Sequence, residues 1–300
     1  MGVFTLRYFV FIMLSLVVCG AYANDFDIAL DTVRANCSDI SSGLSDLKKM
    51  AGINTAITGV GTAVATGAAV VGVVKKSVDK DWRDMLRNAD NVNNTTVNPS
   101  LDDVLSVYDK YIAKYGDIKK AQNALYKKSK SLGYWRTGLL GGSTATNVAG
   151  AIIASNNKID GDLQAHIDRC IQSVDALKNA VGQARIDGAD TTKADKIINL
   201  CGQWKYADLS VVNIRAKRAM ISSIVGVSTG AVGTVTSAVA NTDSVRSGTE
   251  QKEKNLNTAA NILAGGTALA SGIATVFNAT QISAVKKIVN IADDCEEALK

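Results

Sequence analysis

The sequence predicts an all-α protein built from long antiparallel helical hairpins that pack into a bundle. The chain of 300 residues contains 1 proline, a residue that interrupts helix interiors. Its hydrophobic content of 47% is mostly aliphatic, because aromatic residues make up 5%. Apolar residues also recur at alternating spacings of three and four, which is the pattern of a coiled-coil seam. These observations favour long, uninterrupted helices over strands.

The first 23 residues have the three parts of a secretory signal peptide. Arg7 precedes an apolar run from Tyr8 to Val18, and Ala21 and Ala23 frame a small-x-small cleavage site. The run is shorter than the ~20 apolar residues that a bilayer-spanning helix needs. We therefore expect cleavage after Ala23 rather than an uncleaved N-terminal anchor. The mature chain is expected to be exported, as a periplasmic, cell-surface or secreted protein.

Four uncharged segments of the mature chain are rich in Gly, Ala, Ser and Thr: residues 50–74, 137–157, 219–242 and 255–285. Small residues recur in them at every fourth position, and such a helix face lets two backbones approach closely. Glycine inside a helix costs ~1 kcal/mol relative to alanine, so close packing is the expected compensation. The residues expected at these contacts are Gly59, Ala63, Gly67, Gly142, Gly150, Gly226, Gly230, Ala264, Ala268 and Gly272.

Amphipathic helices flank these segments, and their apolar residues follow the spacing of a coiled coil. One seam runs through Leu30, Val33, Cys37, Ile40, Leu44, Leu47 and Ala51. A second runs through Leu163, Ile167, Cys170, Val174, Leu177 and Val181. A weaker seam covers residues 200–214, and a seam at residues 288–299 closes the chain. A further helix is expected at about residues 100–130. The flanking helices are expected to extend the hairpins.

The elements suggest two hairpin units, residues 24–188 and 189–300, with the helix near 100–130 inserted in the first. Residues 57–62, ITGVGT, resemble residues 224–229, IVGVST. Residues 139–145, LLGGSTA, resemble residues 263–268, LAGGTA. This similarity indicates an internal duplication, although sequences rich in Gly and Ala also match one another by composition alone.

Four cysteines remain after removal of the signal peptide, and an even number in an exported chain predicts two disulfides. If the small-residue helices cross as hairpins, Cys37 and Cys170 lie at similar distances from one crossing. The same holds for Cys201 and Cys295 at the other crossing. The alternative is that all four are buried free thiols. With no Cys-x-x-Cys pair and with His166 as the single histidine, we expect no metal site.

No sequence motif supports an enzyme. Residues 226–230, GVSTG, match the G-x-S-x-G nucleophile pattern, but that pattern requires a strand before the serine and a histidine base. Helix packing is the preferred interpretation of these residues. We expect no cofactor and no small-molecule substrate. The net charge of +5 comes without a cluster of basic and aromatic residues, so a nucleic-acid partner is not expected.

Two functional hypotheses remain open. In the first, the Gly/Ala-rich hairpins associate with or insert into a membrane, because residues 50–74 and 219–242 are long enough to cross ~30 Å of hydrocarbon. In the second, the chain is a soluble or surface-attached structural bundle stapled by disulfides, which its many Thr, Ser and Asn residues favour. The expected partners are membrane lipid in the first case and further copies of the chain in either.

Overall fold

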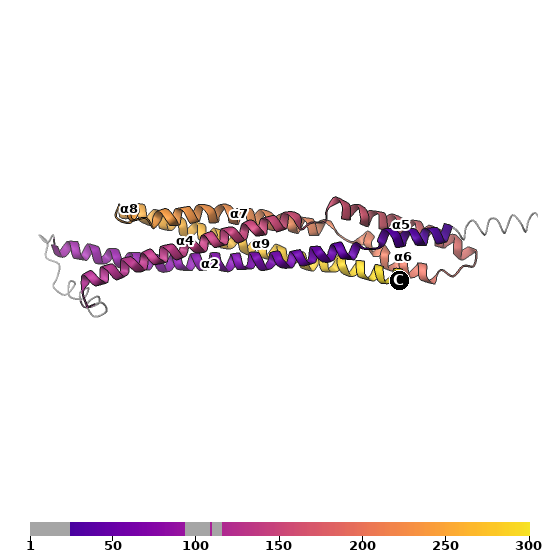
Figure 1. Ribbon diagram of the computed structural model, residues 1–300, viewed down its shortest axis with the longest axis horizontal. Helices are drawn as coiled ribbons and strands as arrows, with labels where there is room; N and C mark the ends of the chain where they lie inside the picture. Colours follow the sequence, from indigo (N-terminus) through magenta and orange to yellow (C-terminus); the bar gives the residue numbers. More distant parts are fainter. Residues whose placement is uncertain (1–24, 94–108, 110–115) are drawn as a thin grey trace, which may run out of the picture. The chain divides into compact units, whose positions relative to one another are not determined.

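The computed structural model describes residues 25–93, 109 and 116–300. These residues are almost entirely helical, and no strand occurs among them, as Figure 1 shows. The predicted all-α class is therefore confirmed. The predicted signal peptide lies outside the described residues.

Long helices make up most of the described chain. Residues 25–37 are helical, and Asp39, with a φ of 63°, interrupts the helix before α2 begins. The remaining helices are α2 (Ile40–Asn93), α4 (Ile118–Asn156), α5 (Gly161–Ile186), α6 (Thr192–Cys201), the 3₁₀ helix η1 (Gly202–Tyr206), α7 (Ser210–Ala240), α8 (Asp243–Arg246) and α9 (Glu250–Leu299). Of the helix expected at about residues 100–130, the later part belongs to α4. Its earlier part lies largely outside the described residues.

The chain divides into two compact units, each drawn from separate stretches of sequence. The disulfide unit comprises Met1–Ile53, Ser155–Lys217 and Asn278–Lys300, and the bundle unit comprises Asn54–Ala154 and Arg218–Phe277. Helices α2, α7 and α9 contribute to both units, and so does α4 with its last two residues, Ser155 and Asn156. The predicted boundary at residue 188 falls between α5 and α6, within the disulfide unit. The two predicted hairpin units and the duplication stay predictions.

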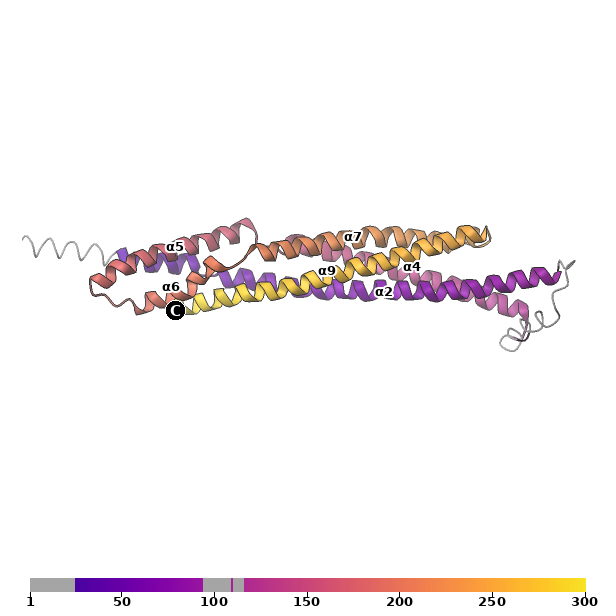
Figure 2. The same cartoon turned by 180° about the vertical axis from the view of Figure 1, so that it is seen from behind.

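The disulfide unit has a conventional aliphatic core. Leu44, Ile167, Leu177 and Ile197 are fully buried there, together with the indole of Trp204. Figure 2 shows α5 and α6 beside the C-terminal end of α9. Large apolar side chains that meet in one core stabilise the unit by removal of their surface from water.

The described part of the bundle unit consists of four long helices, α2, α4, α7 and α9, and the short helix α8. Gly61 on α2 lies against Thr146 on α4, whereas Gly67 lies against Leu139. Residue numbers thus rise along one helix as they fall along the other, so the two helices run in opposite directions at this contact. The contacts of α4 with α7, of α7 with α9 and of α9 with α2 show the same opposite direction of residue numbers, so these pairs are antiparallel as well.

Each helix of the bundle unit turns a stripe of small or polar residues toward the interior, at alternating spacings of three and four. The buried residues on α2 are Asn54, Thr58, Gly61, Ala65, Ala68, Gly72 and Lys75. Those on α4 are Arg136, Leu140, Ser143, Asn147, Gly150 and Ala154. Those on α7 are Ala219, Ser223, Gly226, Gly230, Gly233 and Ser237, and those on α9 are Asn257, Ala260, Ala264, Thr267, Ser271 and Ala274. This spacing is that of a left-handed coiled coil, built here mainly from small side chains.

Candidate functional site: an apolar band around a polar interior

The outer face of the bundle unit is apolar. Leu269 on α9 is 71% exposed and Val235 on α7 is 64% exposed. The bundle unit holds most of the exposed large hydrophobic residues: Val60, Val70, Val73, Val74, Tyr134, Trp135, Val148, Ile152, Ile221, Ile224, Val225, Val232, Val235, Val239, Ile262, Leu269, Ile273 and Val276. An exposed apolar surface of this extent marks a site of contact with lipid or protein.

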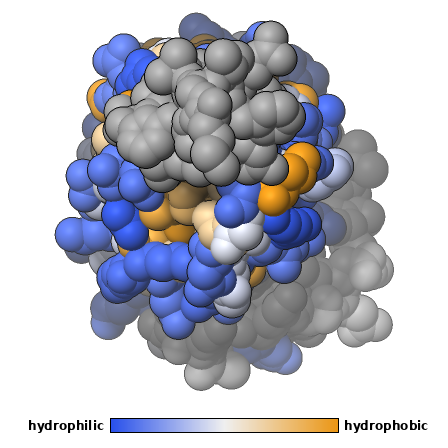
Figure 3. Space-filling model, turned by 90° about the vertical axis from the view of Figure 1, so that its right-hand side faces the viewer, coloured by the Kyte–Doolittle hydropathy of each residue, from blue (hydrophilic) through white to orange (hydrophobic). Residues whose placement is uncertain are grey.

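The end of the disulfide unit that carries α5 and α6 has a different surface. Figure 3 views this end, and its visible residues are mostly hydrophilic, with a smaller apolar patch. Fewer exposed large hydrophobic residues belong to the disulfide unit, among them Ile186 and Tyr206. The apolar outer face is therefore a property of the bundle unit.

Charged residues are absent from a band of sequence in each bundle helix: residues 54–74, 137–154, 219–239 and 258–277. These bands lie at the same level. Gly59 on α2 is level with Thr275 on α9, and Gly61 is level with Thr146 on α4. Gly150 on α4 is in turn level with Ser223 on α7. The band on α2 is ~30 Å long at the helical rise per residue. Such a length matches the hydrocarbon core of a bilayer.

Three described helices are long and apolar enough to cross a membrane, within Asp25–Arg87, Thr192–Ala240 and Glu250–Leu299. In each of these helices, only 28% to 33% of the most apolar 18-residue stretch is buried. Helix α4 does not reach this hydropathy. Its band includes Ser143 and Asn147, and both of these side chains are fully buried in the bundle.

Hydrogen bonds between polar side chains connect the helices inside the band. Nδ2 of Asn147 on α4 donates to Oγ of Ser271 on α9 over 2.8 Å. Oγ of Ser143 donates to the carbonyl oxygen of Gly61 on α2 over 3.0 Å, and Oγ1 of Thr267 donates to Oγ1 of Thr229 over 3.0 Å. The bundle unit thus has polar groups inside and aliphatic groups outside, the reverse of an ordinary water-soluble core.

The predicted packing residues differ in how deeply they are buried and in how closely they approach a neighbouring helix. Gly150, Gly226, Gly230 and Ala264 are buried between helices. A Cβ atom on Gly59, Gly67, Gly142 or Gly272 would make an ordinary contact of 3.6 to 3.9 Å with a neighbouring helix, and Ala268 is half-buried. Ala63 and Gly142 are exposed, because the interior stripes follow Gly61 and Ala65 on α2 and Leu140 and Ser143 on α4.

Close contacts also occur at glycines that the four-residue spacing misses. A Cβ atom on Gly61 would lie 2.5 Å from Oγ1 of Thr146, and one on Gly72 would lie 2.0 Å from Oδ1 of Asn261. A Cβ atom on Gly133 would lie 2.2 Å from Oδ1 of Asn241, which directly follows α7. Continuing the three-four seam of residues 30–51 through the small-residue segment would have identified Gly61 and Gly72.

A cluster of buried charges lies at the end of the bundle where α8 joins α7 to α9. Lys75 is fully buried and donates from Nζ to Oδ2 of Asp79 over 2.5 Å. Glu253 on α9 pairs with Arg83 on α2.

Arg246 on α8 also belongs to this cluster. Its guanidinium is buried and donates to Oγ of Ser129 on α4 over 2.9 Å. The central carbon of the guanidinium lies 4.6 Å from the ring centre of Tyr126 on α4. Buried ions of both signs therefore join the ends of α2, α4, α8 and α9.

Burial shifts the pKa values of two groups in this cluster, Lys75 and Glu253. Loss of hydration lowers the pKa of Lys75, although Asp79 opposes the change. Loss of hydration also raises the pKa of Glu253, and Asp79 adds to the rise, while Arg83, Lys75 and Arg246 oppose it. In both groups the cost of desolvating the charged form exceeds the gain from opposite charges nearby. No motif or spacing in the sequence indicates this cluster.

Arg136 lies at the edge of the apolar band and bonds to neutral groups. Its Nε donates to Oγ of Ser237 over 2.8 Å, its Nη1 to Oδ1 of Asn261 over 3.0 Å, and its Nη2 to Oδ1 of Asn257 over 2.8 Å. Burial lowers the pKa of this guanidinium to about 10. The side chain therefore joins α4 to α7 and α9 at the level where the uncharged bands end.

A groove of about 670 Å³ opens beside this cluster between α2 and α9. Its basic lining residues are Lys76, Lys80, Arg83, Arg87 and Lys254. Its acidic lining residues are Asp79, Asp84 and Glu250. The hydroxyl and amide groups of Ser77, Thr258, Asn257 and Asn261 complete its polar wall, and Val73 lies where the groove meets the apolar band.

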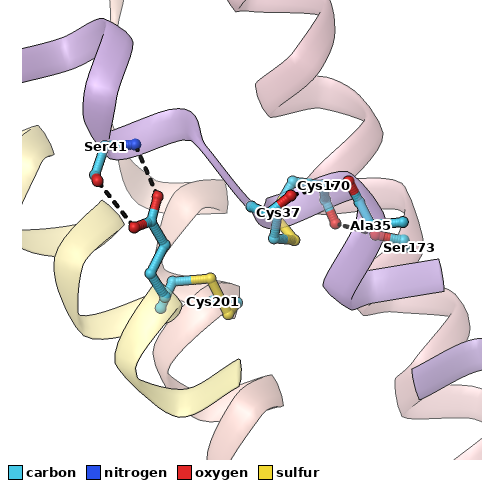
Figure 4. Close-up of a disulfide and its surroundings, with 9 residues drawn as sticks. Ala35, Cys37, Ser41, Cys170, Ser173 and Cys201 are labelled. Atoms are coloured by element: carbon cyan, nitrogen blue, oxygen red, sulfur yellow. Dashed lines mark hydrogen bonds between the residues drawn. A yellow bond between two sulfur atoms is a disulfide. The ribbon is translucent and has the colours of Figure 1, made fainter. Parts of the chain in front are cut away.

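The disulfide unit contains two disulfides, Cys37–Cys170 and Cys201–Cys295. These are the pairs that the helical spacing predicts. Figure 4 shows them close to Ser41, whose backbone nitrogen and hydroxyl both donate to the carboxylate of Glu296 at 3.0 and 2.9 Å. The sulfur atoms of Cys37, Cys170 and Cys295 lie within 4.8 Å of one another. Since all four cysteines are cross-linked, these sulfurs join helices and are not available as thiolate ligands.

Ser228 and His166, the serine and the histidine that the nucleophile pattern would need, both lie within helices. Ser228, the serine of the G-x-S-x-G match, lies within α7 and donates from Oγ to the carbonyl oxygen of Ile224 over 3.0 Å. His166 is half-buried on α5 in the disulfide unit. Comparison of the chain with protein-family models, with curated proteins and with solved structures finds no match.

Proposed function

We propose that the bundle unit spans a membrane as four helices and anchors the disulfide unit in an oxidising compartment outside the cytoplasm. The observation that carries the proposal is the reversed polarity of the bundle unit. Leu269 and Val235 are exposed, while Asn147 and Ser271 are buried and bonded to each other. Water disfavours this arrangement and lipid favours it, because polar groups in hydrocarbon must find partners inside the protein.

Helix packing supports the proposal. Helices in membranes gain little from hydrophobic burial against one another, so they associate through small residues and interhelical hydrogen bonds. The interior stripes supply both, with Gly226 and Gly230 on α7 against Asn147 and Thr144 on α4. Helix α4, the most polar of the four, keeps Ser143 and Asn147 away from lipid.

Connectivity supports one orientation of the bundle. Residues 54, 154, 218 and 277 are the points at which the bundle unit continues into the disulfide unit. They lie at the same end of the bundle unit, since Gly150 contacts Thr58 and Ser223, and Gly59 contacts Thr275. Disulfides persist in oxidising compartments, so we assign that end to the exported side and the charged end with α8 to the opposite side. The proposed role is structural, as a membrane anchor, and includes no chemical reaction.

Extraction from membranes tests the proposal. We expect the wild-type protein to stay in the membrane pellet after washing with alkaline carbonate and to enter solution in detergent. Replacing Val232 and Leu269 together with Arg should release the protein, because an arginine at the centre of a bilayer costs ~3 kcal/mol. Ile186→Arg is the matched control, since Ile186 is 80% exposed in the disulfide unit. Release of the wild-type protein by carbonate would contradict permanent insertion.

A further inference from the structure

We propose that the groove between α2 and α9 binds the headgroup of an anionic phospholipid. This inference rests on the proposed membrane insertion and names a ligand for the charged end of the bundle. The groove begins where the apolar band ends, since Val73, which is 67% exposed, forms part of its lining. In a membrane-spanning bundle this level coincides with the lipid headgroups.

The charges of the groove favour an anion. Each acidic residue of its lining is already paired with a cation: Asp79 with Lys75, Asp84 with Arg87, and Glu250 with Arg83 and Arg87. The ammonium groups of Lys76, Lys80 and Lys254 form no ion pair with any described residue. The lining of the groove holds five basic and three acidic residues, so its net charge is positive. A phosphodiester bears the complementary charge, and its oxygens accept hydrogen bonds from ammonium and hydroxyl donors.

A second, apolar groove extends along the same two helices. It measures about 480 Å³ and is lined by Thr62, Thr66, Ala268, Leu269, Gly272, Ile273, Val276 and Phe277. From Asn257 in the basic groove to Leu269 in the apolar one, α9 rises ~18 Å. This separation suits a headgroup and the acyl chain attached to it. The two grooves together therefore fit a phospholipid better than a free inorganic anion.

Lipid retention by the full-length protein tests this inference. The protein would be incorporated into vesicles of phosphatidylcholine and phosphatidylglycerol, and insertion would be measured by flotation in carbonate. The inserted protein would then be extracted in mild detergent, and its bound lipid identified by native mass spectrometry. We expect phosphatidylglycerol to be retained selectively. The variant K76Q/K80Q/K254Q should bind it roughly a hundredfold more weakly, because each lysine near an anionic lipid contributes about a factor of five.

A control variant distinguishes binding in the groove from general attraction of anionic lipid to basic residues. K120Q/K127Q/K128Q removes the same charge from exposed positions on α4 at the same end of the bundle, and it should retain phosphatidylglycerol like the wild type. Equal loss in both variants, or no selectivity in the wild type, would overturn the lipid site while flotation still supported insertion. Failure to float with any vesicle would instead overturn the proposed function. If inorganic phosphate displaced the lipid at millimolar concentration, the groove would be a phosphate site and the lipid assignment would be wrong.

Discussion

The side chains of Asn147 on α4 and Ser271 on α9 bond to each other in the interior of the bundle unit. Oγ of Ser271 lies 3.0 Å from Oδ1 of Asn147 and 2.8 Å from its Nδ2. Nδ2 also donates to the carbonyl oxygen of Ser143 over 2.9 Å. An asparagine in an apolar band is thereby satisfied entirely by protein groups, which is what a membrane environment requires.

Replacing Asn147 with Ala should destabilise the bundle by ~1–2 kcal/mol, because it leaves the buried hydroxyl of Ser271 without this partner. Unfolding of the detergent-solubilised protein by increasing mole fractions of sodium dodecyl sulfate measures the change. Asn255→Ala on the exposed face of α9 is the control and should have little effect. Equal stability of both variants would argue against an interhelical role for Asn147.

Two glycine substitutions should change stability in opposite directions. A Cβ atom on Gly226 would lie 2.8 Å from the terminal atoms of Asn147, whereas one on Gly265 would meet nothing within 4 Å. Gly226→Ala should therefore cost ~1–3 kcal/mol through overpacking. Gly265→Ala should stabilise helix α9 by up to ~1 kcal/mol. The same unfolding assay distinguishes them, and a shared direction would contradict the close packing of α7 on α4.

The raised pKa of Glu253 predicts a pH-dependent difference between the wild type and Glu253→Gln. Above its ordinary pKa of 4.5, the folded protein keeps a proton that the unfolded chain has lost. Wild-type stability therefore falls as pH rises through the raised pKa, and Gln has no such proton. The variant should gain stability relative to the wild type as the pH rises from 4.5 toward the raised pKa of Glu253.

Glu250→Gln is the control, because its stability relative to the wild type should change with pH in the opposite direction. The hydrogen bond from Arg87 lowers the pKa of Glu250, so this carboxylate stabilises the fold above its unfolded pKa. Glu250→Gln should therefore lose stability relative to the wild type as the pH rises from below the lowered pKa of Glu250 toward 4.5. If both variants changed in the same direction, the assigned environment of Glu253 would be wrong.

Peptide mapping without reductant should recover Cys37 linked to Cys170 and Cys201 linked to Cys295. Free thiols must be blocked at low pH first, because three of the four sulfurs lie within 4.8 Å and could exchange. Replacing Cys201 and Cys295 with Ser should cost ~2–5 kcal/mol, since that bond closes a long loop, with a sequence separation of 94. Four alkylatable thiols in the exported protein would contradict both cross-links.

The sequence predicts the helical class and the cysteine pairs because both follow from local spacing. The seam through Leu44, Leu47 and Ala51 continues without a break into Asn54, Thr58 and Gly61. The four-residue spacing of Gly59, Ala63 and Gly67 concealed this continuation. A spacing rule applied to small residues is ambiguous, because adjacent positions are equally small and hydrophobicity does not separate the inner from the outer face.

The charged cluster could not be derived in the same way. Lys75 and Asp79 continue the seam of α2, but charged residues at seam positions usually indicate that a helix has ended or turned to solvent. Their burial depends on Ser129, Arg246 and Glu253, which are distant in sequence. Such long-range complementarity is visible only once the four helices are assembled.

If lipid surrounds the bundle unit, spin labels on its outer face in liposomes should be accessible to reagents that dissolve in lipid. Labels would be attached to single cysteines introduced at Val225 and Leu269, in the exposed part of the band, and at Ile186 in the disulfide unit. We predict that collisions with oxygen exceed those with a water-soluble nickel chelate at Val225 and Leu269, and that the order is reversed at Ile186. Nickel collisions that exceed oxygen collisions at all three positions would contradict the membrane-spanning bundle.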